Sequence, residues 1–452
     1  MGSKRHLGLG KASKAKKQKQ QDTKEKEAGD SSNGESKQLT VELSEEVDPD
    51  DELAQLKALW KTAQSSEEKD QLIYNGIIHE CDRLLREHAA QENGDKEQES
   101  SNKKITLPDF FHSIYALALV ELAVFESEDK QKVSDLFDAA LERIELGFEK
   151  HDGSIDLLLA QSKILLDQIS LQFIKNLEVS SEVGESSPDL SMNLDKALNS
   201  YEKAEEKAQK IQKDAFYGSK MLEVLDTLDS LLQIIDDFGE EKVEADESDD
   251  EEDEDVPKVE LSKKHPLFNI RNNEKYDSWW RDHTITLFDY IEKQLTDEGV
   301  DLISLSTDTH TLLREKKADE NEKLALRREV SKSLGQSYLQ EAETPSNIFT
   351  ALTYDDEYAD YKELDGLTKE SSRDISIDLL TTALKYLKIA QDKDEPDSWV
   401  AVAECLISLG NLHELDSKEQ EDHYTQAEKI LETANNVTNG KYDSILENLQ
   451  AN

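Results

Sequence analysis

The stretch Ala383-Leu-Lys-Tyr-Leu387-Lys-Ile-Ala390 places two small residues and one large residue on the same side of a helix. The spacings of four and three residues give this result because an α-helix has about 3.6 residues per turn. Small residues let a neighbouring helix approach closely, and the leucine fills the groove between them. The pattern recurs at Ala140/Ile144/Gly147, Ala197/Tyr201/Ala204 and Ala427/Leu431/Ala434.

This recurrence is typical of the second helix of tetratricopeptide repeats, whose helix pairs stack into a solenoid. First-helix features accompany it: Leu334-Gly335 with Tyr338, and Trp399 with Val402, Ala403 and Leu406 after Pro396. The connections from Tyr338 to Ala383 and from Leu406 to Ala427 exceed the roughly nine residues of a standard repeat. We therefore predict degenerate repeats, with a generic helical bundle as the alternative. A solenoid would offer a concave face that binds peptides or partner helices.

Amphipathic helices are predicted over most of the remaining chain. Leu53, Leu56, Leu59 and Trp60 follow Asp51-Glu52 at helix spacing, and acidic residues suit a helix N-terminus. The most apolar helix opens at Pro108-Asp109 and extends to Phe125. Further helical blocks cover residues 133–149, 155–177, 194–213 and 217–238. Because no window of similar length alternates with period two, the fold class is predicted to be all-α.

An acidic run divides the chain into two predicted helical halves. Residues 244–255 hold ten acids in twelve positions, and their mutual repulsion predicts a disordered linker over 241–262. The halves cover 49–240 and 263–452. Ser248, with Glu251 three residues later, matches a site for an acid-directed kinase, where a phosphate would add negative charge.

The first 48 residues are predicted to be a disordered tail, since they contain almost no large apolar residue. Seven basic residues precede the first acid at Asp22: Lys4, Arg5, Lys11, Lys14, Lys16, Lys17 and Lys19. Two basic groups with a short spacer are typical of a bipartite nuclear localisation signal. The alternatives are a solvated tail without that role and a tail that contacts nucleic acid. We predict a nuclear protein.

The overall charge limits the partners of the folded part. A formal net charge of −47 repels a phosphate backbone and attracts basic protein surfaces, so no direct nucleic-acid binding is expected there. The longest runs without a charge have 11 residues, such as 110–120, too few to cross a membrane. The two cysteines, Cys81 and Cys405, form no CxxC motif, which fits a reducing compartment.

No catalytic, cofactor-binding or metal-binding residues are predicted. Phosphate-loop, zinc-protease, serine-hydrolase and kinase motifs are all missing from the sequence. His79-Glu80-Cys81 is no metal site, because adjacent helical residues point about 100° apart. Trp279-Trp280 is predicted to pack in the core or between domains. These observations favour a protein without enzymatic activity.

Several segments together resemble the fungal family named enhancer of translation termination 1. They are Lys4-Arg5-x-Leu7-Gly-Leu-Gly-Lys11, Asp51-Glu-Leu-Ala-Gln-Leu-Lys57, Asn75-Gly-Ile-x-His79-Glu-Cys-Asp-Arg-Leu-Leu-Arg86, Phe111-His-x-Ile114-Tyr-Ala-Leu-Ala-Leu119, Glu341-Ala-Glu-x-Pro345-Ser346 and Asp394-x-Pro396-Asp-x-Trp399-Val400. The resemblance implies a nuclear protein that promotes accurate stop-codon termination. It also implies a partner resembling the iron- and 2-oxoglutarate-dependent prolyl hydroxylase called termination and polyadenylation protein. His6 stands where the family's opening motif has proline.

Two functional hypotheses from different classes follow. The first is a protein-binding adaptor of translation termination, active in translation and transcription regulation. The second is an acidic histone-type chaperone, because helical repeats beside an acidic run suit the shielding of basic proteins. An enzyme of unfamiliar type is disfavoured by the empty motif scan.

Overall fold

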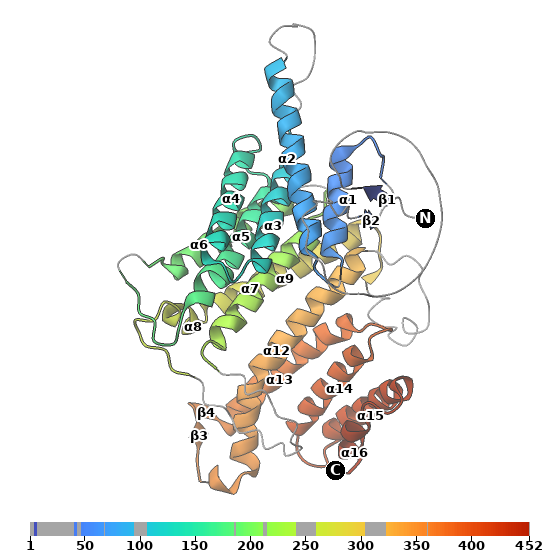
Figure 1. The fold of residues 1–452 in the computed structure, drawn as a ribbon. Helices are drawn as coiled ribbons and strands as arrows, with labels where there is room; N and C mark the ends of the chain where they lie inside the picture. The colour runs from blue at the N-terminus through green and yellow to red at the C-terminus, as the bar shows by residue number, and fades with distance from the viewer. Residues whose placement is uncertain are drawn as a thin grey trace, which may run out of the picture. The chain divides into compact units, whose positions relative to one another are not determined.

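The computed structural model describes residues 4–6, 40–42, 47–66, 68–94, 106–184, 187–210, 215–240, 259–302, 322–358 and 360–451 (Figure 1). The chain forms two units. Unit 1 contains residues 1–204 and 264–266, and unit 2 contains residues 205–263 and 267–452. The division falls inside helix α6 (Leu190–Lys210). The sequence placed its boundary later, at 241–262, and most of that segment lies outside the described residues.

Unit 1 is built from helices, and each packs on one or more of its neighbours in the sequence (Figure 1). They are α1 (Glu52–Gln64), α2 (Gln71–Gly94), α3 (Asp109–Phe125), α4 (Lys130–Phe148), α5 (Ile155–Gln168) and the first part of α6. A π-helical turn (Ile169–Phe173) and a 3-10 turn (Ile174–Asn176) extend α5. The predicted helix that opens at Pro108-Asp109 is confirmed, and 12 of its 17 residues are buried.

Capping side chains begin several helices of unit 1, and Asp51 is the one that the sequence predicted. The Asp51 carboxylate accepts a hydrogen bond from the Ala54 amide at 2.9 Å, and Asp129 accepts from the amides of Gln131 and Lys132. The Ser154 hydroxyl accepts from the Leu157 amide at 3.3 Å. Each bond satisfies a backbone N–H that has no partner within the helix, a contribution of about 1 kcal/mol per cap.

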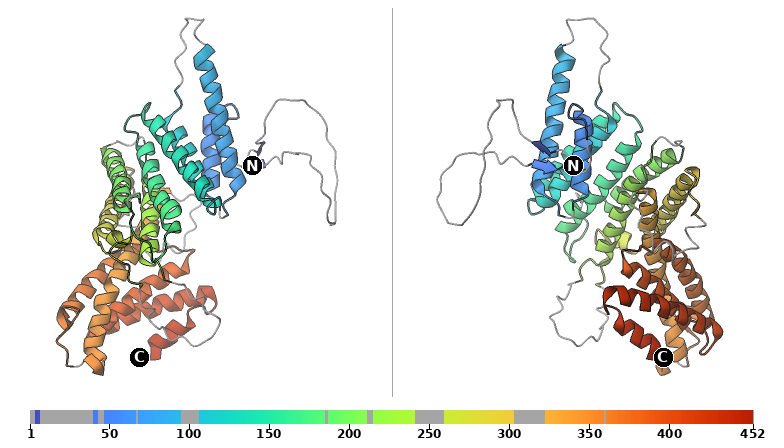
Figure 2. Two further views of the ribbon diagram at one scale, coloured as in Figure 1. Left: turned by 60° about the vertical axis from the view of Figure 1, so that its left-hand side comes forward. Right: turned by 90° about the vertical axis from the view of Figure 1, so that its right-hand side faces the viewer.

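Unit 2 is also built from packed helices. Its elements are α7 (Gly218–Asp236), α8 (Phe268–Arg271), α9 (Lys275–Asp297), α12 (Glu322–Tyr354), α13 (Lys369–Ala390), α14 (Pro396–Asn411), α15 (Lys418–Thr438) and α16 (Asp443–Ala451). Helix α9 packs on α7 and α12, α12 on α13, and α14 on α15. The stacking is also visible from the two directions of Figure 2. The all-α helical-repeat prediction is confirmed, whereas the detailed match to tetratricopeptide repeats stays a prediction.

The residues of the recurring small-large-small pattern are buried in all four instances. In unit 2 the pattern of α13 faces α12, and a methyl group on Gly335 would lie 2.7 Å from Cδ2 of Leu387. In unit 1 a methyl group on Gly147 would lie 2.9 Å from Cδ2 of Leu157. The small residues therefore set how closely neighbouring helices approach, as the pattern predicts.

Short strands occur at two places in the described residues. Lys4–His6 (β1) pairs antiparallel with Thr40–Glu42 (β2), and Glu363–Leu364 (β3) pairs with Leu367–Thr368 (β4). The second hairpin turns at Asp365-Gly366, both with positive φ, as a tight two-residue turn requires. The end of α12, this hairpin and the first part of α13 lie in the long connection from Tyr338 to Ala383. The rest of the predicted tail, up to residue 46, lies outside the described residues.

Candidate functional site

The two cysteines and the residues next to Cys81 are held in packing contacts and ion pairs. Both cysteines are buried, and burial raises the pKa of the Cys81 thiol far above its usual range and that of Cys405 to about 12. Such thiols stay protonated and are poor nucleophiles. His79 is exposed, Cys81 is buried, and Glu80 pairs with Arg83 at 2.7 Å. The three side chains therefore do not converge on one site. Among the described residues, no group of histidine, cysteine and acidic side chains could hold a metal ion.

One histidine is strongly perturbed by its packing. His112 lies in α3 with 6% of its surface exposed, and its ring is 6.2 Å from that of His151. Burial, reinforced by the Arg143 charge, lowers the pKa of His112 to about 4. The imidazole is therefore neutral at physiological pH. Its neighbours belong to the core between α3, α4 and α5, which makes its role structural.

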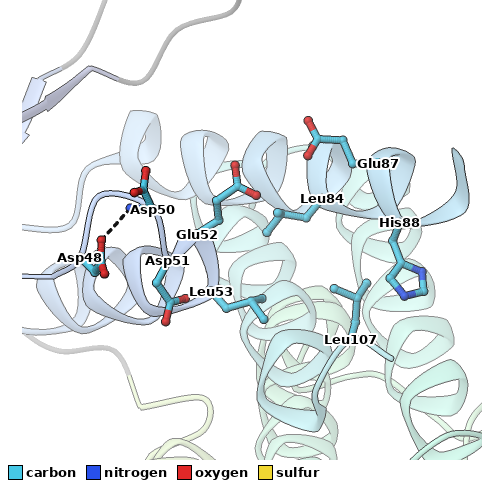
Figure 3. Close-up of a pocket in the computed structure, with 9 residues that line it drawn as sticks. All are labelled: Asp48, Asp50, Asp51, Glu52, Leu53, Leu84, Glu87, His88 and Leu107. Atoms are coloured by element: carbon cyan, nitrogen blue, oxygen red, sulfur yellow. Dashed lines mark hydrogen bonds between the residues drawn. The ribbon is translucent and has the colours of Figure 1, made fainter. Parts of the chain in front are cut away.

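Unit 1 contains an acidic groove, shown in Figure 3, with a volume of about 410 Å³. The groove is lined by Asp48, Asp50, Asp51, Glu52, Leu53, Leu84, Glu87, His88 and Leu107. The three leucines point toward a common space from α1, α2 and the segment before α3. The aspartates lie at one end, and His88 lies at the other. An apolar floor thus lies beside five carboxylates.

The acidic end of the groove is held in place by α1. The side-chain amide of Gln55 donates to the carbonyls of Asp48, at 2.9 Å, and Pro49. Asp48 in turn accepts from the Asp50 amide at 3.0 Å. Because Gln55 is only 3% exposed, this clamp fixes the backbone that presents the aspartates. The exposed carboxylate of Asp50 therefore sits on an ordered segment.

The other groove walls are fixed by contacts of α2 and by the connection between α4 and α5. Arg83 bridges Glu52 at 2.8 Å and Glu87 at 2.6 Å, so one guanidinium neutralises part of the rim. The carbonyl of Leu107 accepts a hydrogen bond from His151 Nε2 at 2.7 Å, which holds the segment before α3. The sequence marked Asp51 and Glu52 only as a helix start. Their proximity to Leu84 and Leu107 could not be read from spacing along the chain.

A second acidic surface lies on unit 2, and we call it the carboxylate row: Glu223, Asp226 and Asp229 on α7, Asp277 on α9 and Glu329 on α12. Burial, with the charges of its neighbours Asp229, Glu329 and Glu223, raises the pKa of Asp226 to about 6. Burial first, and then Asp277, raises the pKa of Asp229. Carboxylates that repel one another in this way are stabilised by an incoming positive charge. The row suits lysine or arginine side chains of a partner.

The structure describes only some of the residues that the sequence singled out. Lys4 and Arg5 lie in β1, whereas Lys11, Lys14, Lys16, Lys17, Lys19 and Ser248 lie outside the described residues. Trp280 is buried and donates from its indole N–H to the Leu225 carbonyl at 3.0 Å, and the Trp279 ring lies 3.9 Å from that of His283. The predicted packing role of Trp280 is thereby confirmed. No described helix has the length and apolarity that a membrane span requires.

Comparisons with known proteins agree on one family. The family model described as "Nuclear pore complex subunit Nro1" matches residues 1–450. The enhancer of translation termination 1 of Debaryomyces hansenii is 52% identical, and the match covers 100% of both chains. The proteins of the same name in Scheffersomyces stipitis and Candida albicans are each 50% identical over 99% of both chains.

One solved structure is similar at a low level. It is titled "The hypoxic regulator of sterol synthesis Nro1 is a nuclear import adaptor" and matches with a TM-score of 0.42 and 16% identity. The match covers 88% of this chain and 92% of that chain.

Proposed function

The chain belongs to the family described as nuclear pore complex subunit Nro1, and from that membership we propose that it is a nuclear, non-enzymatic adaptor that promotes accurate translation termination. The observation that carries the proposal is the full-length similarity to proteins named enhancer of translation termination 1. The described residues are compatible with an adaptor, because both thiols and the His112 imidazole are buried, whereas the carboxylates of the row are at the surface. The chain acts through its surfaces.

The carboxylate row is the partner-binding surface in this proposal. It presents acids from three helices of unit 2, and the pKa of Asp226 is raised first by burial and then by the neighbouring charges of this row. Basic side chains of a bound protein would relieve that repulsion, so association is expected to be fast and salt-sensitive. The sequence resemblance adds the partner's identity: an iron- and 2-oxoglutarate-dependent prolyl hydroxylase of the termination and polyadenylation type.

Two further parts of the proposal concern residues outside the groove and the row. The basic residues from Lys4 to Lys19 act as a nuclear localisation signal, and Ser248 is a phosphorylation site in the acidic run. The family description and the basic tail support the nuclear assignment. Replacing Lys4, Arg5, Lys14, Lys16, Lys17 and Lys19 with glutamine is expected to abolish nuclear enrichment, and an unchanged distribution would refute this assignment.

The test of the proposed function combines affinity purification with a dual-reporter assay of stop-codon readthrough. In cells that lack the chain, wild type should restore low readthrough and recover the hydroxylase. The variant Asp226→Lys/Asp229→Lys should lose both. The matched control, Asp374→Lys/Asp378→Lys, makes the same charge change at exposed positions of α13 and should retain both. Readthrough that does not respond to loss of the chain contradicts the proposal.

The acidic surfaces also favour a second candidate function, an acidic histone-type chaperone. The same purification separates the two. Near-stoichiometric, salt-sensitive recovery of histones, with normal readthrough in cells that lack the chain, would establish the chaperone and reject the termination adaptor.

A further inference from the structure

Negative charge in the acidic groove is neutralised at one place and left unpaired at another. Glu52 and Glu87 share the guanidinium of Arg83, at 2.8 Å and 2.6 Å. The other acids of the groove lie together at one end and are Asp48, Asp50 and Asp51 (Figure 3). Among the described residues, no lysine or arginine forms an ion pair with these three aspartates. The unpaired charge is therefore concentrated at the aspartate end of the groove.

The start of helix α1 offsets only part of this charge. The Asp51 carboxylate accepts a hydrogen bond from the Ala54 amide at 2.9 Å, and Asp48 accepts from the Asp50 amide at 3.0 Å. These donors are dipoles rather than full charges, and a helix N-terminus as a whole carries about half a positive charge. Negative charge thus remains in excess at three carboxylates, and it attracts a cation from solution.

The floor beside the aspartates is apolar and accessible. Leu53, Leu84 and Leu107 point toward a common space (Figure 3), and Leu53 and Leu107 are only half-buried. The groove volume of about 410 Å³ lies in the range typical of ligand pockets. A metal ion at the aspartates would leave the leucines uncovered. A lysine or arginine next to a large aliphatic residue satisfies both surfaces, because it supplies charge and apolar area together.

Both parts of the groove are held in place by hydrogen bonds within unit 1. The buried Gln55 amide donates to the Asp48 carbonyl at 2.9 Å, and the Leu107 carbonyl is bonded to His151 Nε2 at 2.7 Å. A site that is formed in advance needs little ordering when a ligand binds. The groove therefore suits a short segment that carries its cation and its aliphatic side chain close together.

We propose that the acidic groove binds a short basic segment of a partner protein. A leucine or another large aliphatic side chain of that segment covers the leucine floor, and a neighbouring lysine or arginine pairs with the three aspartates. The aspartate charge disfavours ligands that carry phosphate. The groove lies in unit 1 and the carboxylate row in unit 2, so the chain has a site for a basic partner in each unit. This inference goes beyond the proposed function and does not depend on it.

The test measures binding of a fluorescein-labelled peptide, Gly-Arg-Arg-Leu-Leu-Gly-Gly, to the full-length chain by fluorescence anisotropy. Saturable binding is expected, and Asp48→Asn/Asp50→Asn should weaken it at least about fivefold, because two ion pairs are lost. Asparagine at position 48 keeps a side-chain oxygen that can accept from the amide of residue 50, so the local backbone is preserved. A lack of saturable binding, or equal affinities of the variant and wild type, would overturn the proposal.

Two control variants separate the aspartate end from the overall acidity of the chain. Asp226→Asn/Asp229→Asn removes the same number of charges from the carboxylate row and should leave the affinity within about twofold. A loss equal to that of the groove variant would mean that the peptide binds acidic surfaces in general and would refute the site. Glu87→Gln should also stay within about twofold, because Arg83 already neutralises that carboxylate. A larger loss would contradict the position of the cation at the aspartates.

The leucine floor is tested from the side of the peptide, which leaves the fold of the protein unchanged. Replacing both peptide leucines with serine keeps the charge and should weaken binding at least about tenfold. Unchanged affinity would refute the contact with the floor. A peptide in which p-benzoylphenylalanine replaces one leucine locates the site by photo-crosslinking and mass spectrometry. Adducts are expected on α1, α2 or the segment before α3, and adducts confined to other parts of the chain would overturn the proposal.

These measurements do not read stop-codon readthrough or recovery of the hydroxylase. A failure of the peptide experiments therefore leaves the termination proposal unaffected, and normal readthrough in cells that lack the chain would leave the groove proposal unaffected.

Discussion

Replacing Gly335 with alanine tests whether the small residues of the repeat pattern set the helix spacing. Gly335 lies in α12 and faces α13, where the added methyl carbon would be 2.7 Å from Cδ2 and 2.8 Å from Cγ of Leu387. Carbon atoms at optimal separation are about 3.5 to 4.0 Å apart. The Leu387 backbone nitrogen would lie at 3.3 Å, so rotation of the leucine tip alone does not relieve the clash.

The expected loss of stability is the difference between two opposing effects. Overpacking a close-packed core costs about 1 to 3 kcal/mol. Alanine is about 1 kcal/mol more favourable than glycine inside a helix. The variant Gly335→Ala should therefore be up to about 2 kcal/mol less stable than the parent, although alanine is the better helix former.

Urea unfolding followed by tryptophan fluorescence measures this difference in unit 2. Trp60 is the tryptophan of unit 1, and the other three are Trp279, Trp280 and Trp399 of unit 2. A Trp60→Phe background therefore restricts the signal to unit 2.

The double variant Gly335→Ala/Leu387→Ala supplies the internal control. Leu387→Ala alone should cost about 2 to 5 kcal/mol through the cavity it leaves. The alanine methyl at 335 then partly fills that cavity, so the double variant should be at least about 1 kcal/mol more stable than the sum of the two losses predicts. An additive double variant would refute the spacing argument.

Three further outcomes are expected. Because the pKa of His112 is lowered to about 4, the unfolded chain binds this proton first, so the free energy of unfolding should fall by up to about 3 kcal/mol as pH decreases from about 6.5 to 4. The variant His112→Gln should flatten that part of the curve of stability against pH measured by urea unfolding. An unchanged slope would contradict the assignment. Because the pKa of Asp226 is raised to about 6, the folded chain binds that proton first, and the stability gained from the bound proton is lost as pH rises from about 4 to 6. The variant Asp226→Asn should therefore raise the free energy of unfolding at pH 7.5 by up to about 1 kcal/mol after solvent screening. A lower melting temperature would contradict this expectation. Cys81 and Cys405 should react with a thiol reagent at pH 8 only after unfolding in urea, and rapid labelling of the native chain would contradict their burial.

Local sequence determined where the helices begin and which faces they bury. The helix from Asp109 to Phe125, the Asp51 cap and the burial of Ala383 and Leu387 all follow from residue type and a period of 3.6. These properties depend on neighbours within about one or two turns, so a single sequence contains the information for them. The short hairpin at Asp365-Gly366 was missed because two-residue strands are too brief to show alternation.

Tertiary packing decided which distant helices meet. The boundary between the units falls inside α6 because α7, although it precedes the acidic run, packs on α9 beyond it. The groove likewise joins Leu53, Leu84 and Leu107 from three separate segments. Periodicity fixes the apolar face of each helix, but many partners could cover such a face. The choice among them depends on side-chain volumes and crossing angles that exist only once the whole unit has folded.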